Sequence, residues 1–129
     1  MENLPFTQGL VCPALDARKG EIFAALYRKD SVGRTDRLTD YLSVPPETLS
    51  KMIEGPTLML GDAVPLYGER LQKECTHPIT FAPPEYHFPH ASILCRLAMQ
   101  KLSQGDHQHP RELQALYARA SDAELKRKG

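Results

Sequence analysis

Acidic residues stand at three places where they could share a metal site. Asp16 ends the first apolar segment and Asp62 ends a later one, while a third carboxylate, Glu47 or Glu54, lies in the helical segment between them. Carboxylates brought together in this way can hold two Mg²⁺ ions about 3.5 to 4 Å apart and assist the cleavage of a phosphodiester bond. The spacing therefore allows a metal-dependent nuclease that uses Asp16 and Asp62.

The charges around these acids favour a structural interpretation instead. Arg18 and Lys19 lie close to Asp16 in the sequence and tend to neutralise it. The chain has 16 basic and 16 acidic residues, so it carries no excess positive charge to attract a polyanion. Asp16 is suited to accept hydrogen bonds from the backbone amides of a turn, and Asp62 to cap a helix. We expect these structural roles and no direct contact with nucleic acid.

Four histidines form two close pairs, His87 with His90 and His107 with His109. A zinc site needs three or four converging ligands, and the helical His-Glu-x-x-His pattern that supplies two of them is absent. His87 lies in a proline-rich loop, and His90 stands where a helix is predicted to begin. We expect these to be surface histidines, and the sequence predicts no metal site.

The cysteines and glycines point to no other chemistry. Cys12, Cys75 and Cys95 are odd in number and far apart. Cys12 and Cys95 lie in apolar patterns, which predicts buried free thiols rather than a disulfide framework. The eight glycines are scattered and form no phosphate-binding loop. The sequence thus predicts no cofactor.

Length and composition indicate a single domain. The chain has 129 residues, 41% of them apolar, which is enough for one hydrophobic core. No apolar run reaches the roughly 18 to 20 residues that a membrane-spanning helix needs. Residues 1–10 show neither the basic nor the apolar part of a secretory signal. We therefore expect a cytoplasmic location and no contact with a membrane.

A β-hairpin is predicted at the start of the chain. Two apolar runs, Leu10–Leu15 and Glu21–Tyr27, flank a polar turn that ends in Gly20. Pro13 removes one backbone donor from the first run, which indicates a bulge or an unpaired position there. The mostly polar stretch 34–42 fits a third strand at an edge.

Helices and strands alternate after the hairpin. Helical spacing and boundary residues predict a first helix that begins at Ser43 or Pro45 and is closed by Gly55, and a second helix that begins after Asp62. Two more helices are predicted over 90–104 and 111–128. Short strands are predicted over 57–60, before the second helix, and over 79–82, after it. The resulting order, βββ-α-β-α-β-α with the segment 111–128 as a tail, is that of a three-layer α/β fold with a mixed sheet. Ribonuclease H-like folds have this order. We expect a lead-in over residues 1–9 and one such domain over 10–129.

Two segments resemble motifs of one protein family. Residues 15–23, LDARKGEIF, resemble the (I/L)DAR-x-(G/D)-E-(V/I)-(Y/F) segment of the bacterial TsaB family, also called YeaZ or glycoprotease-like. Residues 116–124 look like the closing segment of that family, P-x-Y-L-R followed by A-E, although alanine replaces its proline and leucine. The residues that match the two motifs are Asp16, Ala17, Arg18, Glu21, Tyr117, Arg119 and Glu124.

The resemblance spans about residues 10–125 and covers only the second half of the two-domain family architecture. It implies a fold of the actin, Hsp70 and sugar kinase superfamily. It also implies a non-catalytic scaffold that supports threonylcarbamoyladenosine (t6A) modification of adenosine 37 in tRNA. It also implies partners, a TsaD-like catalytic subunit and a TsaE-like ATPase. A domain separated from its neighbour exposes apolar surface, so we expect self-association.

The charged residues of the hairpin have two interpretations. Asp16, Arg18 and Glu21 either fix the turn through ion pairs and hydrogen bonds or belong to a docking surface. Exposed ion pairs contribute less than about 1 kcal/mol, so they need partial burial to matter for stability. Because both flanking strands look buried, the structural interpretation is favoured.

Overall fold

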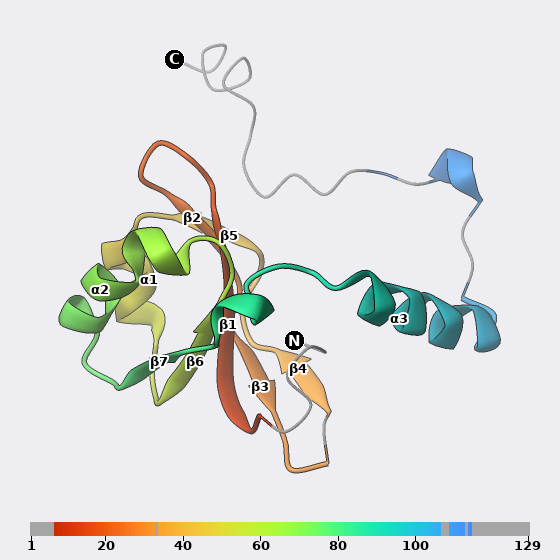
Figure 1. The fold of residues 1–129 in the computed structure, drawn as a ribbon, viewed down its shortest axis with the longest axis horizontal. Coiled ribbons are helices and arrows are strands. Elements are labelled where there is room, and N and C mark those ends of the chain that lie inside the picture. The colour runs from red at the N-terminus through yellow and green to blue at the C-terminus, as the bar shows by residue number, and fades with distance from the viewer. Residues whose placement is uncertain (1–6, 33, 107–108, 113, 115–129) are drawn as a thin grey trace. The chain divides into compact units, whose positions relative to one another are not determined.

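The computed structural model describes residues 7–32, 34–106, 109–112 and 114. These residues divide into two units at Phe88 and Pro89. The first unit contains a sheet and two α-helices, as Figure 1 shows. The second unit contains the helix α3 (Ala91–Ser103) and the short 3-10 helix η2 (Pro110–Glu112). Each unit is described by itself.

Seven strands form one mixed sheet in the first unit. They are β1 (Gly9–Asp16), β2 (Ile22–Ala24), β3 (Tyr27–Lys29), β4 (Thr35–Arg37), β5 (Leu42–Val44), β6 (Thr57–Leu60) and β7 (Ile79–Phe81). The central strand β1 pairs antiparallel with β2 and β3 and parallel with β6, which in turn pairs parallel with β7. The predicted hairpin and the predicted mixture of antiparallel and parallel strands are confirmed.

The predicted second strand is interrupted opposite Pro13. β2 pairs with the last residues of β1 and β3 with its first residues, and both keep one continuous register along β1. Pro13 lies between the two paired stretches and has no N–H to donate to the ladder. Pro13 is therefore unpaired on the side of β2 and β3, as expected, whereas on its other side it pairs with Leu60 of β6. The prediction of a continuous strand over 21–27 is wrong.

Leu26 lies at this interruption and bonds to a different segment. Its N–H donates to Oγ1 of Thr39 at 3.0 Å, and its carbonyl accepts the N–H of Leu38 at 2.8 Å. These bonds divide the single strand expected over 34–42. Its two parts are β4, which pairs with β3, and β5, which pairs with β2.

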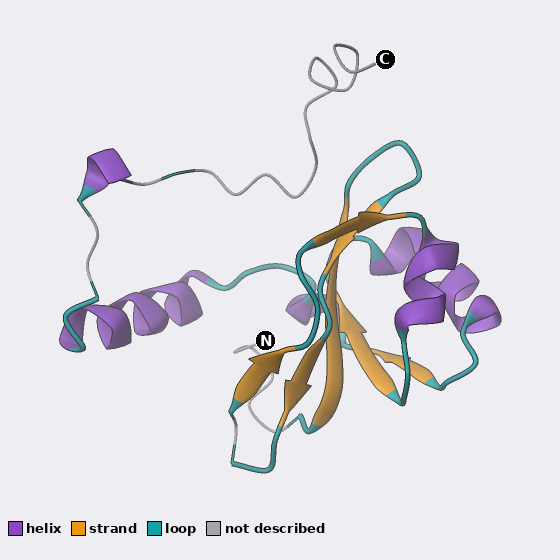
Figure 2. Ribbon diagram, turned by 180° about the vertical axis from the view of Figure 1, so that it is seen from behind, coloured by secondary structure: helices purple, strands orange, loops and turns teal. Residues whose placement is uncertain are grey.

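Two helices cover one face of the sheet. Both α1 (Pro46–Met52) and α2 (Val64–Glu74) begin with proline in the first turn, where a missing N–H costs no hydrogen bond. Their apolar side chains, among them the fully buried Leu49 and Leu71, pack on Cys12 and Met59 of the strands. Figure 2 shows both helices on the same side of the strands. The helices predicted before Gly55 and after Asp62 are confirmed.

The other face of the sheet has a smaller apolar cluster. Val11, next to Cys12 on β1, points away from the helices because side chains alternate along a strand. It packs with Leu60 and Ala82, and Tyr86 of the short helix η1 (Pro84–Tyr86) packs against them. The first unit thus has an α/β architecture with one layer of α-helices. The third layer, and with it the full ribonuclease H-like arrangement, stays a prediction.

The second unit confirms the helix predicted over 90–104, which is α3. The helix predicted over 111–128 and the motif residues Tyr117, Arg119 and Glu124 lie outside the described residues, apart from the turn η2. Within the part of the chain that the structure describes, no helix is long and apolar enough to cross a membrane.

Candidate functional site

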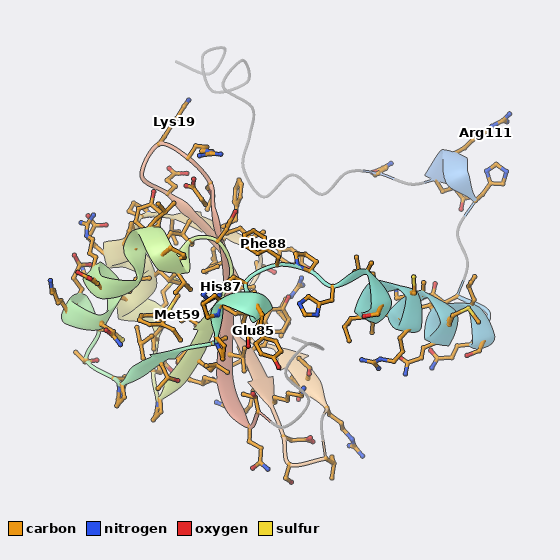
Figure 3. All side chains as sticks on the ribbon, in the orientation of Figure 1. Lys19, Met59, Glu85, His87, Phe88 and Arg111 are labelled. Atoms are coloured by element: carbon orange, nitrogen blue, oxygen red, sulfur yellow. The ribbon has the colours of Figure 1, made fainter. Side chains whose placement is uncertain are left out.

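The β1–β2 turn has an unusual backbone. Arg18 and Lys19 adopt positive φ angles of 63° and 55°, followed by Gly20 at 81°. The turn is closed by two backbone hydrogen bonds, from Ala17 N–H to the Glu21 carbonyl at 3.1 Å and from Glu21 N–H to the Arg18 carbonyl at 3.0 Å. Residues other than glycine rarely adopt this conformation, so bonds from neighbouring side chains have to hold it. Figure 3 shows Lys19 pointing away from the tip of the turn.

Asp16 supplies such bonds. Its Oδ1 accepts the N–H of Arg18 at 2.9 Å, and its Oδ2 pairs with the Arg18 guanidinium at 3.1 Å. The side chain of Asp16 is only 10% exposed, whereas that of Arg18 is 85% exposed. Glu21 accepts a hydrogen bond from the Ser43 hydroxyl at 2.7 Å and so ties the turn to β5. The expected role of Asp16 as a turn acceptor is confirmed.

Asp62 approaches the same end of β1. Its Oδ1 accepts the N–H of Asp16 at 2.9 Å. The cap predicted for α2 is wrong, because the helix begins after Ala63 without a side-chain cap, and the Asp62 carboxylate bonds to β1 instead. The structure therefore brings Asp16 and Asp62 together, but it engages a carboxylate oxygen of each with a backbone amide.

Neither candidate for the third acid of the nuclease hypothesis, Glu47 or Glu54, is shown beside Asp16 and Asp62. Glu54 is exposed and lies beyond the end of α1. Glu47 on α1 forms an ion pair with Arg70 of α2, which also pairs with Glu74. The pKa of Glu47 is lowered, first by a hydrogen bond to its own backbone and then by Arg70. Among the described residues, no group of three or more His, Cys, Asp or Glu side chains could hold a metal ion. In the described part of the chain, Asp16 and Asp62 thus come together without a third such side chain to complete a metal site.

Gly61 fixes how the turn after β6 meets β1. Its φ angle is +116°, and a Cβ atom there would lie 2.0 Å from the carbonyl oxygen of Ala14. That same oxygen accepts the N–H of Ala63 at 3.2 Å, so the two backbones are in direct contact. Only glycine fits this position. From the sequence, Gly61 has no predicted role, because this contact joins segments that are far apart in the chain.

A groove of about 580 Å³ opens beside this turn. Its walls come from the first turns of α2, the end of β7 and the segment 84–87, and the lining residues are Val64, Pro65, Leu66, Gly68, Glu69, Phe81, Ala82, Pro84 and His87. His87 is half-buried, and its Nδ1 accepts the N–H of Gly61 at 3.2 Å. His87 thus lies in a loop, as expected, but it is half-buried rather than fully exposed. No pattern in the sequence indicates its bond to Gly61, because the two residues are far apart in the chain.

The three cysteines differ in how far they are exposed to solvent. All three are free, and burial raises the pKa of Cys12 to about 12. Cys75 is half-buried and donates to the Ser50 carbonyl at 3.6 Å, whereas Cys95 is exposed on α3. The prediction of a buried thiol is confirmed for Cys12 and wrong for Cys95, because α3 has no buried residue.

Comparison with known proteins gives a fold. No protein-family model and no curated protein matches the chain. A crystal structure of an uncharacterized protein with similarity to peptidase YeaZ from Pseudomonas aeruginosa matches over 92% of this chain and 54% of that chain, with a TM-score of 0.63 and 19% identity. This chain has a YeaZ-like fold. A structure of YeaZ from Pseudomonas aeruginosa agrees, with a TM-score of 0.61 and 20% identity over 85% of this chain and 50% of that chain.

The likeness to YeaZ is one of fold, because the sequence identity is low. The chain spans about half the length of both structures. Within this YeaZ-like fold, the segment LDARKGEIF forms the end of β1, the left-handed turn and the start of β2. The motif residues Asp16, Ala17, Arg18 and Glu21 thus lie together in one hairpin.

Proposed function

We propose that this chain is the C-terminal domain of a TsaB-like protein and a non-catalytic scaffold for t6A modification of adenosine 37 in tRNA. The observation that carries the proposal is the YeaZ-like fold over about half of the YeaZ length, combined with the LDARKGEIF segment in its hairpin. The proposed fold class is ribonuclease H-like. The proposed partners are a TsaD-like catalytic subunit and a TsaE-like ATPase, in the cytoplasm.

The absence of catalysis is part of this proposal. The Asp16 carboxylate bonds to the backbone amide of Arg18, and Asp62 bonds to that of Asp16. Acids engaged in this way stabilise a turn and have fewer oxygens left for metal ions. Cys12, buried with a raised pKa, is a poor nucleophile because the thiolate is the reactive form. These contacts support a structural role for the motif residues.

Depletion of the gene that encodes this sequence tests the scaffold role. Mass spectrometry of nucleosides from digested tRNA should show a loss of t6A, and the wild-type gene should restore it. A second tRNA modification, measured in the same digest, serves as the control for general damage. If t6A stays at its normal level after depletion, the proposal is wrong.

A cleavage assay tests the catalytic alternative. The purified chain should leave RNA and RNA/DNA hybrids intact in the presence of Mg²⁺ or Mn²⁺. Cleavage that disappears in both the Asp16→Asn and the Asp62→Asn variants would replace the scaffold by a nuclease. Each variant preserves the size of the side chain, so a change in activity can be separated from a change in folding by a thermal melt.

A further inference from the structure

The groove of about 580 Å³ lies at the carboxyl ends of two parallel strands. β6 and β7 run side by side in the same direction (Figure 1). One wall of the groove comes from the first turns of α2, which follows β6, and the other from Phe81 at the end of β7 and the residues after it. In α/β sheets, ligands bind beyond the carboxyl ends of the strands. The position of the groove, and a volume typical of ligand sites, therefore suit binding.

Close contacts preform the walls of this groove. Gly68 of α2 lies against the ring of Phe81, since a Cβ atom at Gly68 would be 3.0 Å from Cζ of that ring. The Gly61 turn, which leads into α2, is in direct contact with Ala14 of β1. The helix and the strands are thus packed together before a ligand arrives, which lowers the entropy that binding has to overcome.

Apolar side chains form most of the lining and leave part of their surface to solvent. They belong to Val64, Pro65, Leu66, Phe81, Ala82 and Pro84. Leu66 is 62% exposed. An aliphatic side chain that lay against this surface would remove it from water, which is favourable. The lining therefore fits a ligand with an aliphatic group.

Two polar side chains define the rest of the chemistry. Among the described residues that line the groove, Glu69 alone is charged, and Lys73 Nζ is 4.0 Å from its carboxylate, at the limit of an ion pair. This carboxylate can attract a cation on the ligand. His87 accepts the Gly61 N–H at Nδ1, so its neutral ring has the hydrogen on Nε2. The ring can offer this N–H to a carbonyl oxygen of the ligand.

We propose that the groove binds a short segment of a partner protein in which an aliphatic side chain stands next to a lysine or arginine. The aliphatic side chain lies against Leu66 and Phe81, the cation pairs with Glu69, and a backbone carbonyl accepts the Nε2 hydrogen of His87. An acidic segment is repelled by Glu69, and a neutral one lacks the ion pair. The proposal does not depend on the proposed function and is tested without reference to it.

NMR titration of the full chain with three capped peptides tests the groove. The probes are acetyl-leucyl-lysyl-leucine amide and its counterparts with glutamine or glutamate in place of lysine. The lysine peptide should shift the backbone amide signals of Leu66, Glu69 and Ala82, but not that of Val32 in the turn between β3 and β4. At low ionic strength it should bind about threefold more tightly than the glutamine peptide, which corresponds to one exposed ion pair. The glutamate peptide should bind most weakly.

Three variants on α2 assign the binding to the groove. Glu69→Gln should abolish the preference for the lysine peptide over the glutamine peptide. Glu74→Gln is the matched control, because it removes the same charge from the same helix at a residue outside the lining, and it should keep the threefold preference. Leu66→Ala should weaken the binding of all three peptides, since it removes part of the apolar wall.

The outcomes that overturn the proposal are distinct. Amide signals of the lining that stay in place with the lysine peptide would show that the groove binds no such segment. A lysine preference that survives in Glu69→Gln would assign the charge effect to another surface. If the same signals shift when the chain alone is concentrated, the groove is a contact with a second copy, and the proposal of a partner segment is wrong.

Discussion

At the scale of single residues, Asp16 and Arg18 differ in what their removal costs. Asp16 is nearly buried and accepts the amide of Arg18, while Arg18 is largely exposed and holds only one ion pair with it. Asp16→Ala should lower the free energy of unfolding by about 1 to 3 kcal/mol, because an amide loses its acceptor. Arg18→Ala should change it by less than about 0.5 kcal/mol. Urea denaturation of both variants measures the difference.

Arg18 also separates the two interpretations of the motif. If Arg18→Ala leaves stability unchanged and also leaves t6A levels unchanged in cells, Arg18 has neither a structural nor a docking role. Unchanged stability with lost t6A would indicate docking. Equal destabilisation by Asp16→Ala and Arg18→Ala would contradict the geometry of the turn, in which the carboxylate is the buried partner.

Gly61 should tolerate no side chain. The Cβ atom of Gly61→Ala would overlap the Ala14 carbonyl oxygen, and both backbones would have to move. We expect a loss of more than about 4 kcal/mol, which is exceptional for one methyl group. Gly20→Ala is the matched control, because its φ is also positive but no atom lies within 4 Å of the added Cβ. It should cost only about 1 to 2 kcal/mol, and equal melting temperatures for the two variants would refute the close approach.

Cys12 should be the last thiol to react. Its burial and its pKa of about 12 keep it protonated at pH 8, and the folded sheet shields it. Ellman's reagent should therefore label the exposed Cys95 rapidly and Cys12 only after denaturant is added. The Cys12→Ser variant identifies its share of the signal. Rapid native labelling that this variant abolishes would contradict the buried position.

At the scale of elements, helical spacing alone does not decide which leucines of α2 are buried. Leu71 is fully buried against the sheet, whereas Leu66 is 62% exposed. Leu71→Ala should cost about 2 to 5 kcal/mol. Leu66→Ala on the same helix should stay within about 0.5 kcal/mol. Thermal or urea unfolding of the pair tests the helix orientation, and the reverse ranking would show that α2 is rotated.

The strands show that sequence patterns can predict a hairpin but not the boundaries of every strand. Apolar runs and Pro13 correctly indicated a hairpin with an unpaired position. The division of the following strands depends on the hydrogen bonds of Leu26 with Thr39 and Leu38, which join segments more than ten residues apart. Local propensity carries no information on such bonds, so the boundaries of β2 to β5 could not be predicted.

At the scale of the whole molecule, the order of elements was enough to predict a mixed α/β sheet. The candidate site was predicted only in part. Asp16, Arg18 and Glu21 stand in one short motif and were found from the sequence, whereas the bond between Gly61 and His87 was not. The hairpin residues could be found because they are close together in the sequence, as a motif requires. Gly61 and His87 are far apart in the sequence and come into contact only when the chain folds.

The sheet face opposite α1 and α2 leads to a prediction about self-association of the chain. Leu15 lies opposite Phe23 on the face that α1 and α2 do not cover, and it is 48% exposed. Exposed apolar side chains on a sheet favour contact with a second molecule, since burial removes them from water. We therefore expect dimers or larger species in sedimentation velocity runs as the protein concentration rises.

A charge on this face should weaken that association. Leu15→Lys should shift the sedimentation profile toward the monomer, because a buried lysine without a partner is costly. Val32→Lys is the control, since Val32 is 72% exposed in the turn between β3 and β4 and its replacement should leave association unchanged. A wild-type chain that stays monomeric at all concentrations, or a Val32→Lys effect equal to that of Leu15→Lys, would show that the sheet face does not drive association.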